Sequence, residues 1–140
     1  MRNSLSSKDY LKGLVAYGND DYKNLIFCHN VLRNFERLGI HKSLLKKIKD
    51  VLGKLNSVIQ VTESESYIIE NAGLSISGES QTTKNNIKLI KHRNFKLPNG
   101  NFKIFDLHVK NFPDGQRLYF LPDFKSKKIY IGYFGKHLPV

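Results

Sequence analysis

The spacing of apolar residues predicts helices in the first 60 residues of the chain. A first helix should begin directly after Ser6. Ser6 and Asp9, three residues later, resemble a capping box with Asp in place of Glu. Its apolar positions are Leu11, Leu14 and Val15. Gly18 and the Asn19-Asp20 pair should end it, and Asp20 can cap the next helix.

Two longer helices are expected to follow. The helix over 21–38 has these apolar residues at helical spacing: Leu25, Ile26, Leu32, Phe35 and Leu38. Gly39 is a natural residue to follow its end. The helix over 42–56 has one apolar face, made of Leu44, Leu45, Ile48, Val51, Leu52 and Leu55. Its other face carries Lys42, Lys46, Lys47, Lys49 and Lys54, and residues 57–61 either extend it or form a strand.

Residues 62–92 show no clear period and form an acidic and polar connecting segment. No Lys or Arg lies between Lys54 and Lys84, whereas four glutamates do: Glu63, Glu65, Glu70 and Glu79. The small polar residues of 75–86 are typical of a loop.

Alternating apolar and polar residues predict strands from residue 93 onward. We expect four of them, over 93–97, 101–110, 116–121 and 128–134. Short turns separate them, and Gly100 supplies the positive φ of the first. The fold class expected is α+β, with N-terminal helices packed on a C-terminal four-stranded antiparallel meander. The helical region 1–61, the segment 62–92 and the sheet 93–140 should together form one domain.

The positive charge of the chain belongs to its last third. Residues 84–140 carry twelve Lys or Arg against three Asp, a net charge of +9, whereas residues 1–83 have a net charge of +2. A small basic sheet suits a polyanionic partner better than a small neutral metabolite. Nucleic acid or a ribonucleoprotein is therefore the expected partner.

Several classes of protein are disfavoured by composition. The single Cys28 excludes an intrachain disulfide and a cysteine-rich zinc site, which fits a reducing compartment. Residues 1–13 contain no apolar core of a secretory signal, and no apolar run approaches ~18 residues. We expect a cytoplasmic protein with no membrane contact, no metal and no cofactor.

Strand alternation gathers polar and aromatic side chains on one face of the expected sheet. His108, Lys110 and Arg117 share this face with Tyr119 and Tyr130. Cations there can neutralise phosphates while rings stack on bases. The same set suits RNA cleavage, in which a base takes the 2′-OH proton, cations stabilise the phosphorane and an acid protonates the leaving oxygen.

Two groups of residues are assigned from this surface. The candidate catalytic residues are His108, Lys110, Arg117 and His137, the last because the C-terminal segment leaves strand four near the same face. The candidate nucleic-acid contacts are Arg93, Tyr119, Tyr130 and Lys136. The other histidines have simpler explanations: His29 packs on a helix or lies on the surface, His41 starts a helix, and His92 precedes strand one.

The segment from Ser77 to Pro139 resembles a group of small bacterial proteins with a recurring layout. The layout has Ser-Gly-Glu-Ser (77–80), Arg-x-Phe-x-Leu-Pro (93–98), His-x-Lys (108–110), Arg-Leu-Tyr-Phe (117–120) and Ile-Tyr-Ile-Gly-Tyr-Phe-Gly-Lys-His-Leu-Pro (129–139). Helices followed by a basic meander are similar to the RelE/ParE toxin superfamily, which includes ribosome-dependent mRNA interferases and gyrase poisons. The resemblance covers under half of the chain.

This resemblance implies a toxin that cleaves mRNA on the ribosome and is held by a cognate antitoxin protein. RelE-type toxins use basic residues on the central strands, which Arg117 matches, and a Tyr or His near the C-terminus, which His137 matches loosely. The chain departs from the pattern in its N-terminal segment of about 60 residues and in having a single arginine on its last three expected strands.

Three functions therefore stay open at this point. The first is a metal-independent endoribonuclease acting on mRNA in the ribosome or on free RNA. The second is a non-catalytic nucleic-acid-binding module of a phage or mobile element. The third is a protein-interaction or inhibitor module whose basic face docks on an acidic partner, and the acidic residues 63–79 could cover that face within or between chains.

Overall fold

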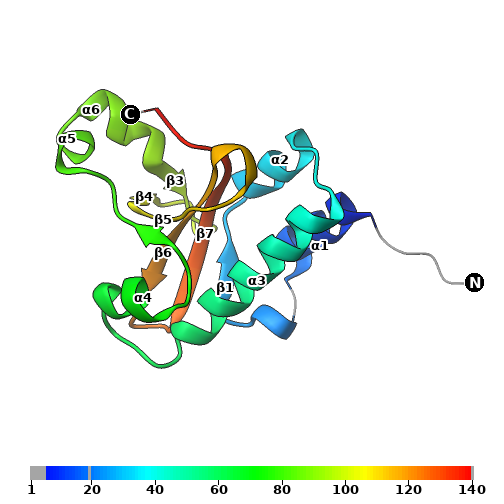
Figure 1. Cartoon of the computed structure of the whole chain (residues 1–140). Helices are drawn as coiled ribbons and strands as arrows, with labels where there is room; N and C mark the ends of the chain where they lie inside the picture. Colours follow the sequence, from blue (N-terminus) through cyan, green and yellow to red (C-terminus); the bar gives the residue numbers. More distant parts are fainter. Residues whose placement is uncertain (1–5, 19, 140) are drawn as a thin grey trace, which may run out of the picture.

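The computed structural model describes residues 6–18 and 20–139 (Figure 1). Its α-helices are α1 (Ser7–Tyr17), α2 (Asn30–Arg37), α3 (Lys42–Val58), α4 (Glu65–Asn71), α5 (Gln81–Lys84) and α6 (Ile87–Ile90). Short 3₁₀ turns are η1 (Asp20–Tyr22), η2 (Lys91–Arg93) and η3 (Pro113–Gly115). The strands are β1 (Leu25–Phe27), β2 (Ile76–Ser77), β3 (Asn94–Lys96), β4 (Phe102–Ile104), β5 (Leu107–Val109), β6 (Gln116–Asp123) and β7 (Lys128–Lys136).

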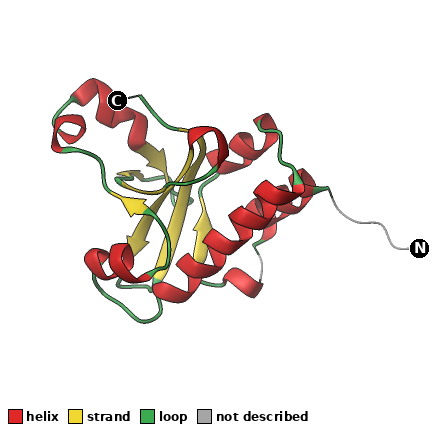
Figure 2. Ribbon diagram, in the orientation of Figure 1, coloured by secondary structure: helices red, strands yellow, loops and turns green. Residues whose placement is uncertain are grey.

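The α+β class is confirmed, but the four-stranded meander is wrong. The main sheet has five strands in the order β1-β7-β6-β5-β2, and β3 and β4 form a separate two-stranded sheet. Figure 2 shows the strands in yellow and the helices around them in red. Strand β1 runs parallel to β7, and the other pairs are antiparallel. The expected strand 101–110 is broken at Phe105 and Asp106, so that its two halves belong to different sheets.

The N-terminal helices are only partly as predicted. Ser6 Oγ accepts the Asp9 N–H at 3.1 Å, and α1 ends at Gly18 with φ 75°. Asn19, the other part of the predicted break, lies outside the described residues. Helix α3 extends to Val58, and His41 caps its start by accepting the Leu44 N–H at 3.2 Å.

The predicted helix over 21–38 is wrong in its first half. The apolar run Leu25-Ile26-Phe27 forms β1 and pairs in parallel with Ile129–Ile131 of β7. The Cys28 N–H continues the ladder to the Ile131 carbonyl at 2.9 Å. A short apolar run fits a strand or a helix, and here the open edge of β7 decides between them.

Residues 62–92 contain more structure than predicted. Ser64 caps α4 by accepting the Tyr67 N–H at 3.3 Å, and β2 adds an edge strand by pairing Ile76 with Val109. Ser80 caps α5 in the same way. Serine is a preferred N-cap residue, so Ser64 and Ser80 were signals in the sequence for the starts of these two helices.

A β-bulge decides which residues of β7 face the core. Tyr119 pairs with Tyr133, but Phe120 pairs with Ile131, so Gly132 is the extra residue. The bulge places Phe134 on the core face and Tyr133 on the other face, the reverse of simple alternation. Glycine is required there because a Cβ at Gly132 would meet the Phe105 ring at 2.6 Å.

The two faces of the main sheet are covered by different parts of the chain. Phe134 packs against Phe35 of α2, so α2 and α3 cover the face of the sheet on which Phe134 lies (Figure 1). Tyr133 stacks on Phe95 with ring centroids 5.8 Å apart, so the β3–β4 hairpin covers the other face. Buried apolar residues from Leu11 to Leu138 belong to one core.

Helix α2 also completes the β7 edge where β1 stops. Asn30 Nδ2 donates to the Gly132 carbonyl at 2.5 Å, and the Phe134 N–H donates to Asn34 Oδ1 at 3.1 Å. Asn30 and Asn34 are four residues apart and lie on one face of the helix. They satisfy two backbone groups of the bulged strand that have no strand partner on that side.

Within residues 6–18 and 20–139, no helix is both long and apolar enough to cross a membrane.

Replacing Gly132 with Ala should lower the free energy of unfolding by about 1–3 kcal/mol, because the added methyl overlaps the Phe105 ring. Gly53→Ala in α3 is the matched control, since nothing lies within 4 Å of its Cβ position. That change should raise stability by up to about 1 kcal/mol. Urea denaturation measures both, and a neutral Gly132→Ala variant would contradict the packing described.

Candidate functional site

The carboxylate of Glu79 is the centre of a buried polar cluster, formed with Arg93, His108 and Tyr119. Its Oε2 accepts from Arg93 Nε at 2.5 Å, and its side chain is 3% exposed. Its Oε1 lies 3.2 Å from His108 Nδ1 and accepts from the Tyr119 hydroxyl at 3.4 Å. Three different elements, η2, β5 and β6, therefore converge on one carboxylate.

Arg93 uses the rest of its guanidinium to hold the chain around this cluster. Nη1 donates to the carbonyls of Leu89 at 2.9 Å and Pro139 at 2.5 Å, and Nη2 donates to Leu138 at 3.5 Å. The side chain is fully buried. Arg93 was assigned to nucleic-acid contact, but in this structure it has no exposed surface, because a carboxylate fourteen residues earlier pairs with it.

His108 and Tyr119 lie on the face predicted for them but are buried there. They are direct partners in the β5–β6 register, and their ring centroids are 4.8 Å apart. His108 is 3% exposed and Tyr119 is fully buried. The Glu79 carboxylate contacts both side chains, and strand alternation alone could not predict this.

Burial keeps the imidazole of His108 neutral. Loss of solvent lowers its pKa, and the positive charges of Arg117 and Lys110 act in the same direction. Glu79 and the Asp106 carbonyl favour the protonated ring, but Arg93 already offsets the Glu79 charge. With Nδ1 protonated, neutral His108 donates to Glu79 and to the Asp106 carbonyl, 3.2 Å away.

The remaining assigned residues lie around the edge of the cluster. Lys110 and Arg117 are half-buried, and their positive charges act on His108. Lys136 and His137 are exposed, with His137 Nδ1 3.3 Å from the Leu138 carbonyl. Tyr130 is half-buried and pairs with Leu121 at the far end of β6.

Asp106 links the cluster to α5. One carboxylate oxygen accepts the Glu79 N–H at 2.5 Å, and the other lies 3.2 Å from Lys84 Nζ. A Cβ at Gly78 would meet that second oxygen at 3.0 Å. Neither Glu79 nor Asp106 was assigned a role from sequence, where Glu79 belonged to an acidic segment with no visible partner.

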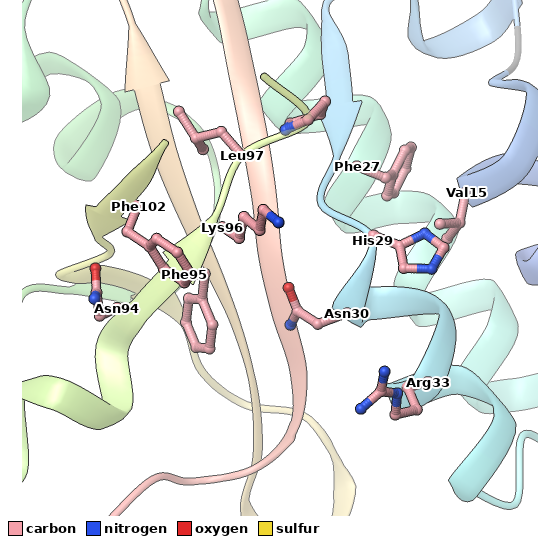
Figure 3. A pocket seen from close by; sticks show the side chains of 11 residues that line it. Val15, Phe27, His29, Asn30, Arg33, Asn94, Phe95, Lys96, Leu97 and Phe102 are labelled. Atoms are coloured by element: carbon pink, nitrogen blue, oxygen red, sulfur yellow. The ribbon is translucent and has the colours of Figure 1, made fainter. Parts of the chain in front are cut away.

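An open cleft lies apart from this cluster, between the β3–β4 hairpin and the β1–α2 connection (Figure 3). Its volume is about 830 Å³. The polar residues that line it are His29, Asn30, Arg33, Asn94 and Lys96. Sequence reasoning missed it, because its two walls are about 60 residues apart in the chain.

Comparisons with protein-family models, with curated proteins and with solved structures gave no match. Among residues 6–18 and 20–139, no three His, Cys, Asp or Glu side chains are grouped so as to hold a metal ion.

Replacing Arg93 with Met should lower the free energy of unfolding by about 3–5 kcal/mol, because Glu79 is left as an uncompensated buried charge. Adding Glu79→Gln to that variant should restore part of the loss. The control is Lys54→Met, which breaks a half-exposed pair with Asp50 and should cost at most about 0.5 kcal/mol. Equal losses on urea denaturation would contradict the buried pair.

The free energy of unfolding should also fall as the pH drops below about 6.5. The pKa of His108 is lower in the folded protein than its ordinary value of 6.5, so the unfolded chain binds more protons in the window between the two. Stability from this group is therefore complete above pH 6.5 and is lost below it. His108→Asn should show a shallower pH dependence in denaturation series, and an unchanged one would refute this assignment.

Proposed function

We propose that this protein is a metal-independent endoribonuclease that acts on mRNA, as RelE-like toxins do. The observation that carries the proposal is the position of His108. It is oriented by Glu79 and flanked by the cations Arg117 and Lys110 on one face of the sheet. An imidazole, an orienting carboxylate and two cations are the groups that metal-free RNA cleavage uses.

Each residue has a role in the proposed reaction. The reaction requires RNA to reach His108, which is 3% exposed. Neutral His108 would then accept the 2′-OH proton, and Glu79 would stabilise the imidazolium that forms. The bond from the 2′ oxygen to phosphorus then forms, and the bond to the 5′ oxygen breaks. Arg117 and Lys110 would stabilise the charged phosphorane between these steps. The exposed His137 is the candidate acid for the leaving 5′ oxygen.

The ribosome and an antitoxin protein enter the proposal through the resemblance alone. The substrate is mRNA, either free or engaged on the ribosome. Residues 84–140 have a net charge of +9. A cognate antitoxin would bind the sheet face that carries Lys110 and Arg117 and would block access of RNA to it.

A second candidate, non-catalytic RNA binding, is favoured by the burial of His108 and Tyr119. With His108 3% exposed, the groups that RNA reaches directly on this face are Arg117, Lys110 and the exposed Lys136. Cations without an accessible base bind phosphates but do not cleave them.

The proposal is tested with fluorescein-labelled single-stranded RNA in two arms. In the first arm the RNA is free and excess EDTA removes metal ions, and in the second it is engaged on ribosomes in a Mg²⁺ buffer. We expect cleavage of RNA and none of DNA of the same sequence, which lacks the 2′-OH. Arg117→Ala should lower the rate by about 100-fold or more. Lys125→Ala, at an exposed lysine in the β6–β7 turn, is the control and should cleave normally. Thermal melting confirms that both variants are folded.

The same experiment separates the two candidates. Salt-dependent RNA binding with a slope near −0.7 per contacted phosphate, without cleavage in either arm, would refute the enzyme and support the binding module. Absence of both cleavage and binding would refute both.

A further inference from the structure

The geometry points to a nucleotide-binding site in the cleft between the β3–β4 hairpin and the β1–α2 connection (Figure 3). The ligand is one nucleotide unit, an aromatic base with its phosphate, taken from a single strand or from a free mononucleotide. The volume of about 830 Å³ is within the ordinary range of small-ligand sites, about 300–1,000 Å³. This site is separate from the Glu79 cluster and does not require cleavage there.

The charge of the cleft is positive. Arg33 extends into it from α2, and Lys96 points into it from the opposite wall on β3 (Figure 3). His29 lies on the same side as Arg33, and no Asp or Glu lines the cleft. In the described part of the chain, neither Arg33 nor Lys96 has an ion-pair partner. Two cations without ion-pair partners on opposite walls of one cleft favour binding of a phosphate there.

An aromatic ring lies beside one of these cations. Phe102 is 59% exposed, and its β4 position pairs with Lys96 of β3, so the two side chains share a face of the hairpin. Phe95 also lines the cleft, but its ring is held by Tyr133 and Phe105. Phe102 is therefore the ring available to stack on a base while Lys96 holds the adjoining phosphate.

Polar groups at the rim complete the site. Asn94 is exposed at the hairpin wall, and its amide offers donors and an acceptor to the edge of a base. Asn30 is fixed by its bond to the Gly132 carbonyl, which anchors the other wall to β7. A cation pair, an exposed ring and a rim amide distinguish a nucleotide from a simple anion, which would use the cations alone.

The test is a titration of the whole protein with adenosine monophosphate, adenosine, ribose 5-phosphate and an oligoadenylate hexamer, followed by NMR or calorimetry. The nucleotide and the hexamer should bind more tightly than either fragment. Arg33→Ala and Lys96→Ala should each weaken binding by about tenfold. Phe102→Leu should lower the affinity for ligands that contain a base by about tenfold and leave the affinity for ribose 5-phosphate unchanged.

Matched controls come from the same elements. Arg37→Ala on α2, Lys103→Ala on β4 and Ile104→Ala on β4 change exposed residues that do not line the cleft. They should leave affinity within about twofold of the wild type. Because all six residues are exposed, each variant should keep its thermal transition.

The outcomes distinguish a free nucleotide from a single strand as the ligand, and both from diffuse attraction to a basic surface. Tight binding of the mononucleotide assigns the site to free nucleotides, and binding of the hexamer alone assigns it to single strands. Equal weakening by the cleft and control variants would show diffuse attraction to a basic surface and overturn the site. No binding of any probe would also overturn it, whereas loss of RNA cleavage alone would leave it standing.

Discussion

The buried ion pair between Glu79 and Arg93 is the interaction on which the structure of the basic region, residues 84–140, depends. The carboxylate takes donors from η2, β5 and β6, and the guanidinium holds α6 and the C-terminal residues Leu138 and Pro139. Burying two charges is costly, and it is tolerated here because almost every polar atom of the pair has a partner. The pair thereby fixes where the segment 78–93 crosses the sheet.

This placement has consequences on both sides of the segment. On one side, Glu79 contacts His108 and Tyr119, and these two residues are buried where alternation predicts an exposed face. On the other side, the chain leaves Arg93 directly into β3, which carries Phe95 and Lys96 to the wall of the cleft. The candidate reaction site and the candidate nucleotide site are therefore linked through one ion pair, although they share no residue.

Strand β7 is the second constraint on the fold, because its backbone forms hydrogen bonds with three neighbouring elements. It pairs with β6 along its length, accepts β1 in parallel, and uses Asn30 and Asn34 of α2 beyond the end of β1. The bulge at Gly132 lets Phe95 and Phe105 approach the strand closely. The cleft lies where strand pairing changes to pairing with helix side chains, so its shape depends on this irregularity.

The sequence by itself determined the local elements and the distribution of charge. Several elements are determined by residues within a few positions of each other. They are the caps at Ser6 and His41, the long helix α3, and strands β6 and β7. The shared face of His108 and Tyr119 follows in the same way, since alternation and a short turn set their register.

Only the tertiary structure decided which of these residues are accessible. Arg93 donates hydrogen bonds to Glu79, fourteen positions earlier, and to the Pro139 carbonyl, 46 positions later. No local sequence pattern predicts either contact. Leu25–Phe27 becomes a strand rather than a helix because β7 offers it an edge. Arg33 and Lys96 line one cleft because two segments far apart in the chain form its walls. Burial and convergence are properties of the packed chain, since they depend on long-range contacts that periodicity in the sequence does not encode.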